Sequence, residues 1–192
     1  GMKFYSAQQY REALPHLYQA YEMDNSFVVS LFFAALCEGN LGTSVPRDSL
    51  YQIVLAERER LSPYYVYRAE AQLAMAQGDR VRAEEHARSA AQLAPGSKAW
   101  YNLGHVLNRQ NRPGEARAAL MRLDPEKEPM KNWSGYWAEL ARANDALGRY
   151  EEVLQNAAGM RAAFPDRRGP FWWEVNAYGG MGDMEGLNRV FQ

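Results

Sequence analysis

Histidine and cysteine, the side chains that most often carry metal or nucleophilic chemistry, are few in this sequence of 192 residues. The histidines are His16, His86 and His105, and no two of them stand at the short spacing of a metal-ligand pair. The single Cys37 ends an apolar run that begins at Phe32, which indicates a core thiol. These residues predict neither a metal site nor a catalytic nucleophile, and no cofactor is expected.

The carboxylates occur in short runs. Glu84-Glu85 and Glu151-Glu152 fall on predicted helices, where such runs are typical of a solvated face. The glycine-rich segment 179–183 looks like a phosphate-binding loop, but no strand precedes it and no Lys-Ser/Thr pair follows it. We interpret it as a turn between two helices. Neither pattern predicts an active site, and we expect that the protein is not an enzyme.

The composition favours a globular or repeat protein without a strong charge preference. Apolar residues make up 47% and charged residues 23%, with a net charge of −1, so neither nucleic acid nor an anionic membrane is an expected partner. No stretch approaches the ~18 consecutive apolar residues of a membrane span, and the amino end lacks the apolar segment of a signal peptide. If Met2 is the natural start, we expect a cytoplasmic protein; otherwise we expect a periplasmic or secreted one.

A recurring turn indicates the elements that would position binding residues. In each copy a glycine or polar pair is followed, five residues after its first member, by a small apolar residue, as Gly78-Asp79 is by Ala83. The apolar residues of the five copies are Ala13, Ala83, Ala116, Val153 and Leu187. The last three steps are 33, 37 and 34 residues long, and this near-constant stride indicates stacked helix pairs. Glycine and polar residues suit such turns because they tolerate the backbone angles that stop a helix.

The run Ala99-Trp100-Tyr101-Asn102-Leu103-Gly104, continued by Leu107, Ala116 and Leu120, resembles the tetratricopeptide repeat (TPR) pattern. That pattern reads W-x-x-L-G-x-x-Y and then A-x-x-x-F, so Leu107 replaces Tyr and Leu120 replaces Phe. In it, a large residue such as Trp100 fills the gap between two helices, and Gly104 lets them approach closely. The resemblance implies an all-α fold, a right-handed α-α superhelix or TPR solenoid of about five repeats and roughly eleven antiparallel helices.

The whole chain, 1–192, is predicted to be one TPR-like array. The repeats are expected at 3–25 (a half repeat), 26–61, 62–96, 97–131, 132–166 and 167–192 (incomplete). Phe4–Asp24 is expected to form a long second helix, because its apolar residues recur at steps of three and four. The alternative is that the second helix starts at Tyr10, where the sequence resembles the start of a TPR second helix, and that residues 3–6 are the tail of the preceding helix. The segment 124–132 is rich in charges and contains prolines, which predicts an extended linker and a hinge.

In the TPR family, first helices line a concave groove that holds peptides or helices of partners. Carried over by position, the resemblance selects as peptide-binding residues Arg68, Gln72, Tyr101, Asn102, His105, Asn108, Arg109, Arg142, Trp172 and Asn176. These cations, amides and aromatic rings suit an extended peptide held by its backbone and by an acidic side chain. The alternative is that they form only the polar lining of a solvated face.

One type of TPR groove, the carboxylate clamp of heat-shock co-chaperones, is disfavoured. Arg68, Gln72 and Asn102 match its first three positions, but the last two positions fall on Gly135 and Glu139. A glutamate would repel the carboxylate that a cation should bind there.

The resemblance thus implies a non-enzymatic protein–protein interaction scaffold that binds a peptide or helix of a protein partner in its concave groove. The first alternative is self-association, as a homo-oligomer or a subunit of a larger complex, through uncapped terminal repeats. The second alternative is an enzyme or a carrier of a small ligand.

Overall fold

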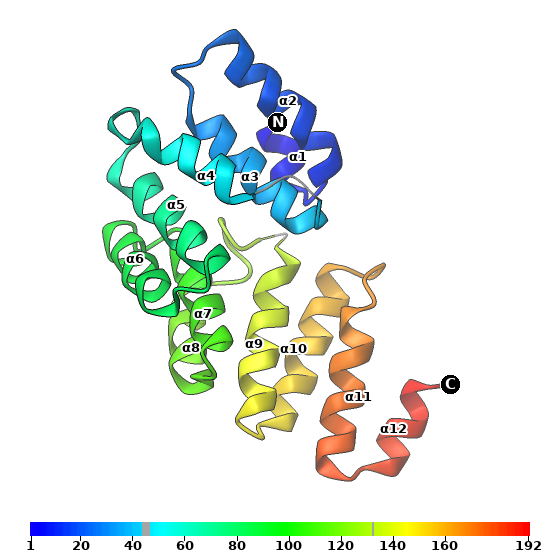
Figure 1. Ribbon diagram of the computed structural model, residues 1–192. Helices are drawn as coiled ribbons and strands as arrows, with labels where there is room; N and C mark the ends of the chain where they lie inside the picture. The colour runs from blue at the N-terminus through cyan, green and yellow to red at the C-terminus, as the bar shows by residue number, and fades with distance from the viewer. Residues whose placement is uncertain (44–46, 132) are drawn as a thin grey trace. The chain divides into compact units, whose positions relative to one another are not determined.

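The computed structural model describes residues 1–43, 47–131 and 133–192. Within these ranges the chain forms twelve α-helices and one short 3-10 helix, with no strand (Figure 1). The predicted all-α fold is confirmed, with one helix more than the roughly eleven expected. None of the helices in the described ranges combines the length and the apolar character needed to cross a lipid bilayer.

The helices follow one another with short connections. They are α1 (Met2–Ser6), α2 (Tyr10–Met23), α3 (Val29–Leu41), α4 (Arg47–Ala56), η1 (Arg58–Arg60), α5 (Pro63–Ala76), α6 (Arg80–Leu93), α7 (Ala99–Arg109), α8 (Pro113–Leu120), α9 (Ser134–Ala146), α10 (Tyr150–Ala163), α11 (Gly169–Met181) and α12 (Met184–Val190). The backbone turns at Gln8 and separates α1 from α2, so one helix over Phe4–Asp24 is wrong, whereas the alternative of a second helix starting at Tyr10 is confirmed.

The turns carry the backbone geometry that their residue types predict. The first residue of each of the five turn pairs has a positive φ: Gln8 (58°), Gly78 (76°), Asn111 (57°), Gly148 (69°) and Gly182 (71°). Glycine adopts this left-handed conformation without steric cost, and asparagine adopts it more readily than most residues. The apolar residues that follow are fully buried at Ala13, Ala83, Ala116 and Val153, and half-buried at Leu187. The segment 179–183 therefore contains a helix turn, as interpreted.

The chain divides into two compact units, Gly1–Ala99 and Trp100–Gln192, and each is described by itself. The first unit has an aromatic core around Phe32, which is fully buried and meets Tyr65 edge to face with ring centroids 5.6 Å apart. Cys37 lies in the same core, and burial raises the pKa of its thiol to about 12. The prediction of a core thiol is confirmed.

In the second unit α9, α10 and α11 pack side by side (Figure 1). Ala141, Val153 and Ala177 are fully buried where these helices meet, because small side chains let helices approach closely. Trp100 differs from expectation. Its ring is only half-buried, and the Arg122 guanidinium lies 4.3 Å from the ring centroid, so it is a partly exposed platform and not a full core residue.

The segment expected to be an extended linker lies in this second unit. Its described part, 124–131, forms hydrogen-bonded turns, such as Met130 N–H to Lys127 C=O at 2.9 Å, and Met130 is 2% exposed. The expectation of an extended chain is therefore wrong for these residues, while Asn132 lies outside the described ranges. The hinge and the individual repeat limits stay predictions.

Candidate functional site

A buried carboxylate, Glu139 of α9, is the centre of a polar cluster in the second unit. Only 7% of Glu139 is exposed. Its Oε2 accepts a hydrogen bond of 2.7 Å from Asn108 Nδ2, and its Oε1 lies 3.0 Å from His105 Nδ1. Arg142 Nε lies 3.7 Å from Oε2. We call Glu139, His105, Asn108 and Arg142 the Glu139 cluster.

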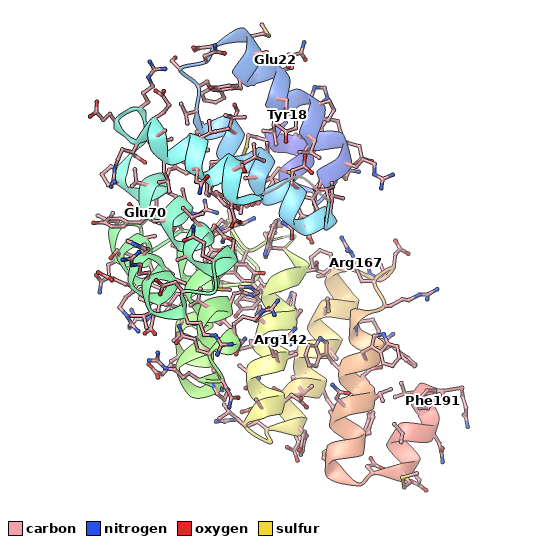
Figure 2. All side chains as sticks on the ribbon, viewed as in Figure 1. Tyr18, Glu22, Glu70, Arg142, Arg167 and Phe191 are labelled. Carbon is pink, nitrogen blue, oxygen red and sulfur yellow. The ribbon has the colours of Figure 1, made fainter. Side chains whose placement is uncertain are left out.

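Two helices position this cluster. His105 and Asn108 lie three residues apart on α7, so they share one helix face, and Glu139 and Arg142 have the same relation on α9. Asn108 Nδ2 also donates to the Glu139 backbone carbonyl at 3.0 Å, which fixes the amide against α9. Arg142, labelled in Figure 2, keeps 57% of its side chain exposed, and its guanidinium lies 5.9 Å from the centroid of the Trp173 ring.

The surroundings of Glu139 keep its carboxyl group ionised. Burial alone would raise its pKa, but the hydrogen bond and the charge of His105 oppose that effect. The hydrogen bond from Asn108 and the charge of Arg142 act in the same direction, and the pKa of Glu139 is lowered as a result.

Glu139 is therefore suited to holding polar groups of α7 and α9 in place. A carboxylate with a lowered pKa stays ionised near neutral pH, so Glu139 has no proton of its own to donate there. Within the described ranges, no group of three or more His, Cys, Asp or Glu side chains is arranged to hold a metal ion.

Comparison with known proteins finds similarity in structure. No model of a known protein family matches the sequence, and no curated protein matches it. The chain is similar to the solved structure of YrrB, described as a TPR protein with an unusual peptide-binding site. That match has 16% identity and a TM-score of 0.60, and covers 91% of this chain and 88% of YrrB.

Two further solved structures are similar at 15% identity. PilW, described as a type IV pilus biogenesis factor, matches with a TM-score of 0.70 over 98% of this chain and 86% of PilW. The Cut9–Hcn1 hetero-tetramer of the APC/C matches with a TM-score of 0.62 over 95% of this chain, which spans 40% of the matched one. At such low identity these likenesses establish a shared fold.

The chain has the TPR fold. In a TPR array each repeat contributes a first and a second helix, and α7, α9 and α11 occupy the first-helix positions of the second unit. The Glu139 cluster thus lies between two successive first helices.

Two residues predicted to bind a peptide lie on α5, a TPR first helix of the first unit. Gln72 is half-buried, but Arg68 is 7% exposed, and its guanidinium lies 4.9 Å from the Phe32 ring centroid and 5.4 Å from that of Tyr64. Arg68 therefore packs against aromatic rings as a buried cation. It is less accessible than a residue that lines an open groove.

The other eight predicted residues belong to the second unit. Tyr101 is half-buried and meets Trp133 edge to face at 6.0 Å, and Asn102 is also half-buried. The structure brings His105, Asn108 and Arg142 together around Glu139. Arg109, Trp172 and Asn176 are exposed, with Trp172 62% exposed. We call the exposed or half-exposed set Asn102, Arg109, Arg142, Trp172 and Asn176 the first-helix surface.

Glu139, the central residue of the cluster, was not among the residues predicted from the sequence, where it appeared only as a carboxylate that would repel an acidic ligand. A signal for its true role was present. His105 and Glu139 are 34 residues apart, one repeat length, and residues at one register in successive TPR repeats lie side by side. A glutamate that follows a histidine by one repeat length is therefore predicted to lie beside it.

Proposed function

We propose that this protein is a non-catalytic interaction scaffold that binds a peptide or helical segment of a protein partner on the first-helix surface. The observation that carries the proposal is the Glu139 cluster, in which a buried carboxylate fixes polar side chains of α7 and α9. Arg142 belongs both to this cluster and to the first-helix surface, and a side chain that is held before a ligand binds loses less conformational entropy on binding.

The charges of this surface favour an acidic partner. Arg109 and Arg142 are the two cations of the first-helix surface, and the carboxylate that Arg142 contacts, Glu139, is buried among its own partners. A planar guanidinium binds carboxylates with two parallel hydrogen bonds. A peptide with an acidic side chain between apolar residues would satisfy both the cations and the exposed Trp172 ring.

The amides of the surface suit the backbone of the same peptide. Asn102 and Asn176 each offer a donor and an acceptor, which match the carbonyl and N–H groups of an extended chain. The description of YrrB as a peptide-binding TPR protein supports this assignment by analogy of fold.

The test is selection of binders from a random peptide library, followed by affinity measurement by calorimetry. Arg109→Ala/Asn176→Ala should weaken the selected peptides at least tenfold, because both side chains are exposed on the first-helix surface. The matched control is Asn188→Ala/Arg189→Ala, which removes the same residue types from the exposed face of α12. Equal affinity of both variants, or a selection without any acidic or aromatic preference, would reject the proposal.

Self-association is a second candidate, because the end of the second unit exposes apolar side chains. Met184 is 63% exposed and Phe191, labelled in Figure 2, is 64% exposed, and Phe171 meets Phe191 edge to face at 5.5 Å. Contiguous exposed apolar residues often mark protein contacts. Sedimentation equilibrium separates the candidates: a dimer that Phe191→Ser converts to a monomer supports this one, and a strict monomer at high concentration excludes it.

A further inference from the structure

A polar cavity of about 350 Å³ opens in the second unit among α8, α9 and α10. Its volume is at the lower end of the roughly 300–1,000 Å³ of small-ligand pockets. The residues that line it include Arg117, Leu123, Tyr136, Asn144, Glu152 and Asn156. We call this cavity the Asn156 pocket.

The Asn156 pocket is separate from the first-helix surface. On α9, Tyr136 and Asn144 line the pocket, while Glu139 and Arg142 belong to the Glu139 cluster. At 100° per residue, the directions of these two pairs differ by about 130° around the helix axis. The two sites therefore use different sides of the same helix.

Two buried amides form the floor of the pocket. Asn144 is 2% and Asn156 is 8% exposed. Asn144 Oδ1 accepts from Arg117 Nε at 2.9 Å, and Asn144 Nδ2 donates to Asn156 Oδ1 at 2.9 Å. This chain of bonds uses the side-chain oxygens of both amides and orients both groups.

One donor remains. The bond with Asn144 uses only the Asn156 side-chain oxygen, so the Asn156 Nδ2 donor is left for another partner. An acceptor lies one turn away on the same face of α10: the Glu152 carboxylate, which accepts two hydrogen bonds from Arg149 and lies 3.7 Å from Arg117 Nη2. The pocket thus presents a donor and an acceptor on α10, and the charge of Glu152 is already paired with Arg149.

The remaining walls are largely apolar. Leu123 is 7% and Leu140 is 8% exposed, and the Tyr136 hydroxyl is directed to the Leu123 carbonyl at 3.4 Å. A group that both donates and accepts, carried on a short apolar stem, matches this lining.

We propose that the Asn156 pocket is a second binding site, which accepts the primary carboxamide of a partner's glutamine side chain. The carboxamide oxygen accepts from Asn156 Nδ2, and its NH2 group donates to Glu152. The two methylenes of the side chain lie against Leu123 and Leu140. This site goes beyond the binding proposed for the first-helix surface, and each can exist without the other.

The experiment uses N-acetyl-glutamine N-methylamide as the probe, with the isosteric glutamate and methionine compounds for comparison. NMR titration of the full chain should give saturable shifts of the Asn144 and Asn156 side-chain amide signals with the glutamine probe. The glutamate and methionine compounds should both bind at least tenfold more weakly, because neither has the NH2 group that donates to Glu152. Free glutamine, a zwitterion, tests whether the ligand of the pocket is the free amino acid or a glutamine within a polypeptide. Tighter binding of free glutamine than of the capped probe would overturn the assignment to a partner's side chain.

The decisive variant is Asn156→Asp. It keeps an oxygen for Asn144 Nδ2 but removes the free donor, so affinity for the glutamine probe should fall at least tenfold while the helical content stays the same. Asn188→Asp, on the exposed face of α12, is the matched control and should leave binding unchanged. Arg109→Ala/Asn176→Ala should also leave it unchanged, which distinguishes this site from the first-helix surface.

Three further results would overturn the proposal: no saturable shift with wild-type protein, equal binding of the glutamine and glutamate compounds, or shifts confined to residues of the first-helix surface. Because these readouts use wild-type protein, they hold even if Asn156→Asp does not fold.

Discussion

Glu139 shows how a buried charge is accommodated in a helical repeat. An isolated carboxylate in an apolar interior would be costly, but Glu139 receives a hydrogen bond from Asn108 and lies beside His105 and Arg142. The same contacts hold two predicted peptide-binding residues of α7 in fixed positions. A single acid thus holds in place Arg142 of the proposed binding surface and the polar side chains beside it.

Glu139→Gln should lower the free energy of unfolding by about 1–3 kcal/mol. The amide keeps one oxygen to accept from Asn108 Nδ2, but it loses the negative charge that strengthens this hydrogen bond and attracts Arg142. Urea denaturation followed by circular dichroism measures the change. Glu185→Gln is the control, because the Glu185 side chain is 93% exposed and its loss should change stability by less than about 0.5 kcal/mol. Similar effects of the two substitutions would contradict the assigned role of Glu139.

The stabilisation by Glu139 should depend on pH. Its pKa is lower in the folded protein than the unfolded value of about 4.3, so the contribution is complete above that value and is lost as the pH falls through the folded pKa. The difference in stability between wild type and Glu139→Gln should therefore shrink as the pH falls below about 4.3. Parallel urea titrations from neutral to acidic pH measure it. A difference that widens on acidification would show that the pKa is raised instead.

At the scale of helices, close approach depends on positions where a side chain cannot fit. Gly104 is one: a Cβ there would lie 2.6 Å from Leu120 Cγ and 3.3 Å from the Ala116 carbonyl oxygen, so α7 and α8 pack directly against each other. The sequence pattern predicted this role for Gly104, and the structure confirms it. The turn glycines have a different role, since Gly148 has open space around it but a φ of 69°.

Gly104→Ala should destabilise the protein by about 1–3 kcal/mol, as expected when a well-packed contact is overfilled. Gly114→Ala provides the matched comparison, because it lies in α8 with nothing within 4 Å of the added Cβ. That change should stabilise by about 0.4–1 kcal/mol through the unfolded chain. Thermal and urea unfolding measure both variants, and a stabilising Gly104→Ala would refute the close contact of α7 and α8.

At the scale of the whole molecule, the chain consists of two compact units, and each has its own buried residues. Phe32 is fully buried in the first unit, as Val153 is in the second. In repeat proteins stability is approximately a sum of local terms, because each repeat contacts only its neighbours. Damage to one core should therefore remain largely local.

Phe32→Ala should cost the first unit about 3–5 kcal/mol, the usual loss for truncating a buried aromatic residue. Hydrogen exchange measured by mass spectrometry should show faster exchange over residues 1–99, with protection retained in α9, α10 and α11. Val153→Ala should give the reverse distribution. Equal loss of protection in both units for either variant would instead indicate one cooperative block.

Much of this fold could be predicted because its signals are local. The turn residues Gly78, Gly148 and Gly182 recur near a fixed stride, and each has the positive φ that its type allows. The candidate site was only partly predictable. His105, Asn108 and Arg142 were selected from the sequence, whereas Arg68 was expected in a groove and is buried against Phe32. Exposure of a long side chain depends on neighbours that are distant in the sequence.

By itself, the sequence determined the helices, the turns and the stride between repeats, because backbone conformation and burial of small residues follow from residue type and spacing. Only the tertiary structure decided which polar groups meet. Two partners of Glu139, Asn108 and His105, lie 31 and 34 residues away in the sequence, and the amides of Asn144 on α9 and Asn156 on α10 form a hydrogen bond. Such contacts depend on distances of a few ångströms between side chains of different helices, which helix packing sets.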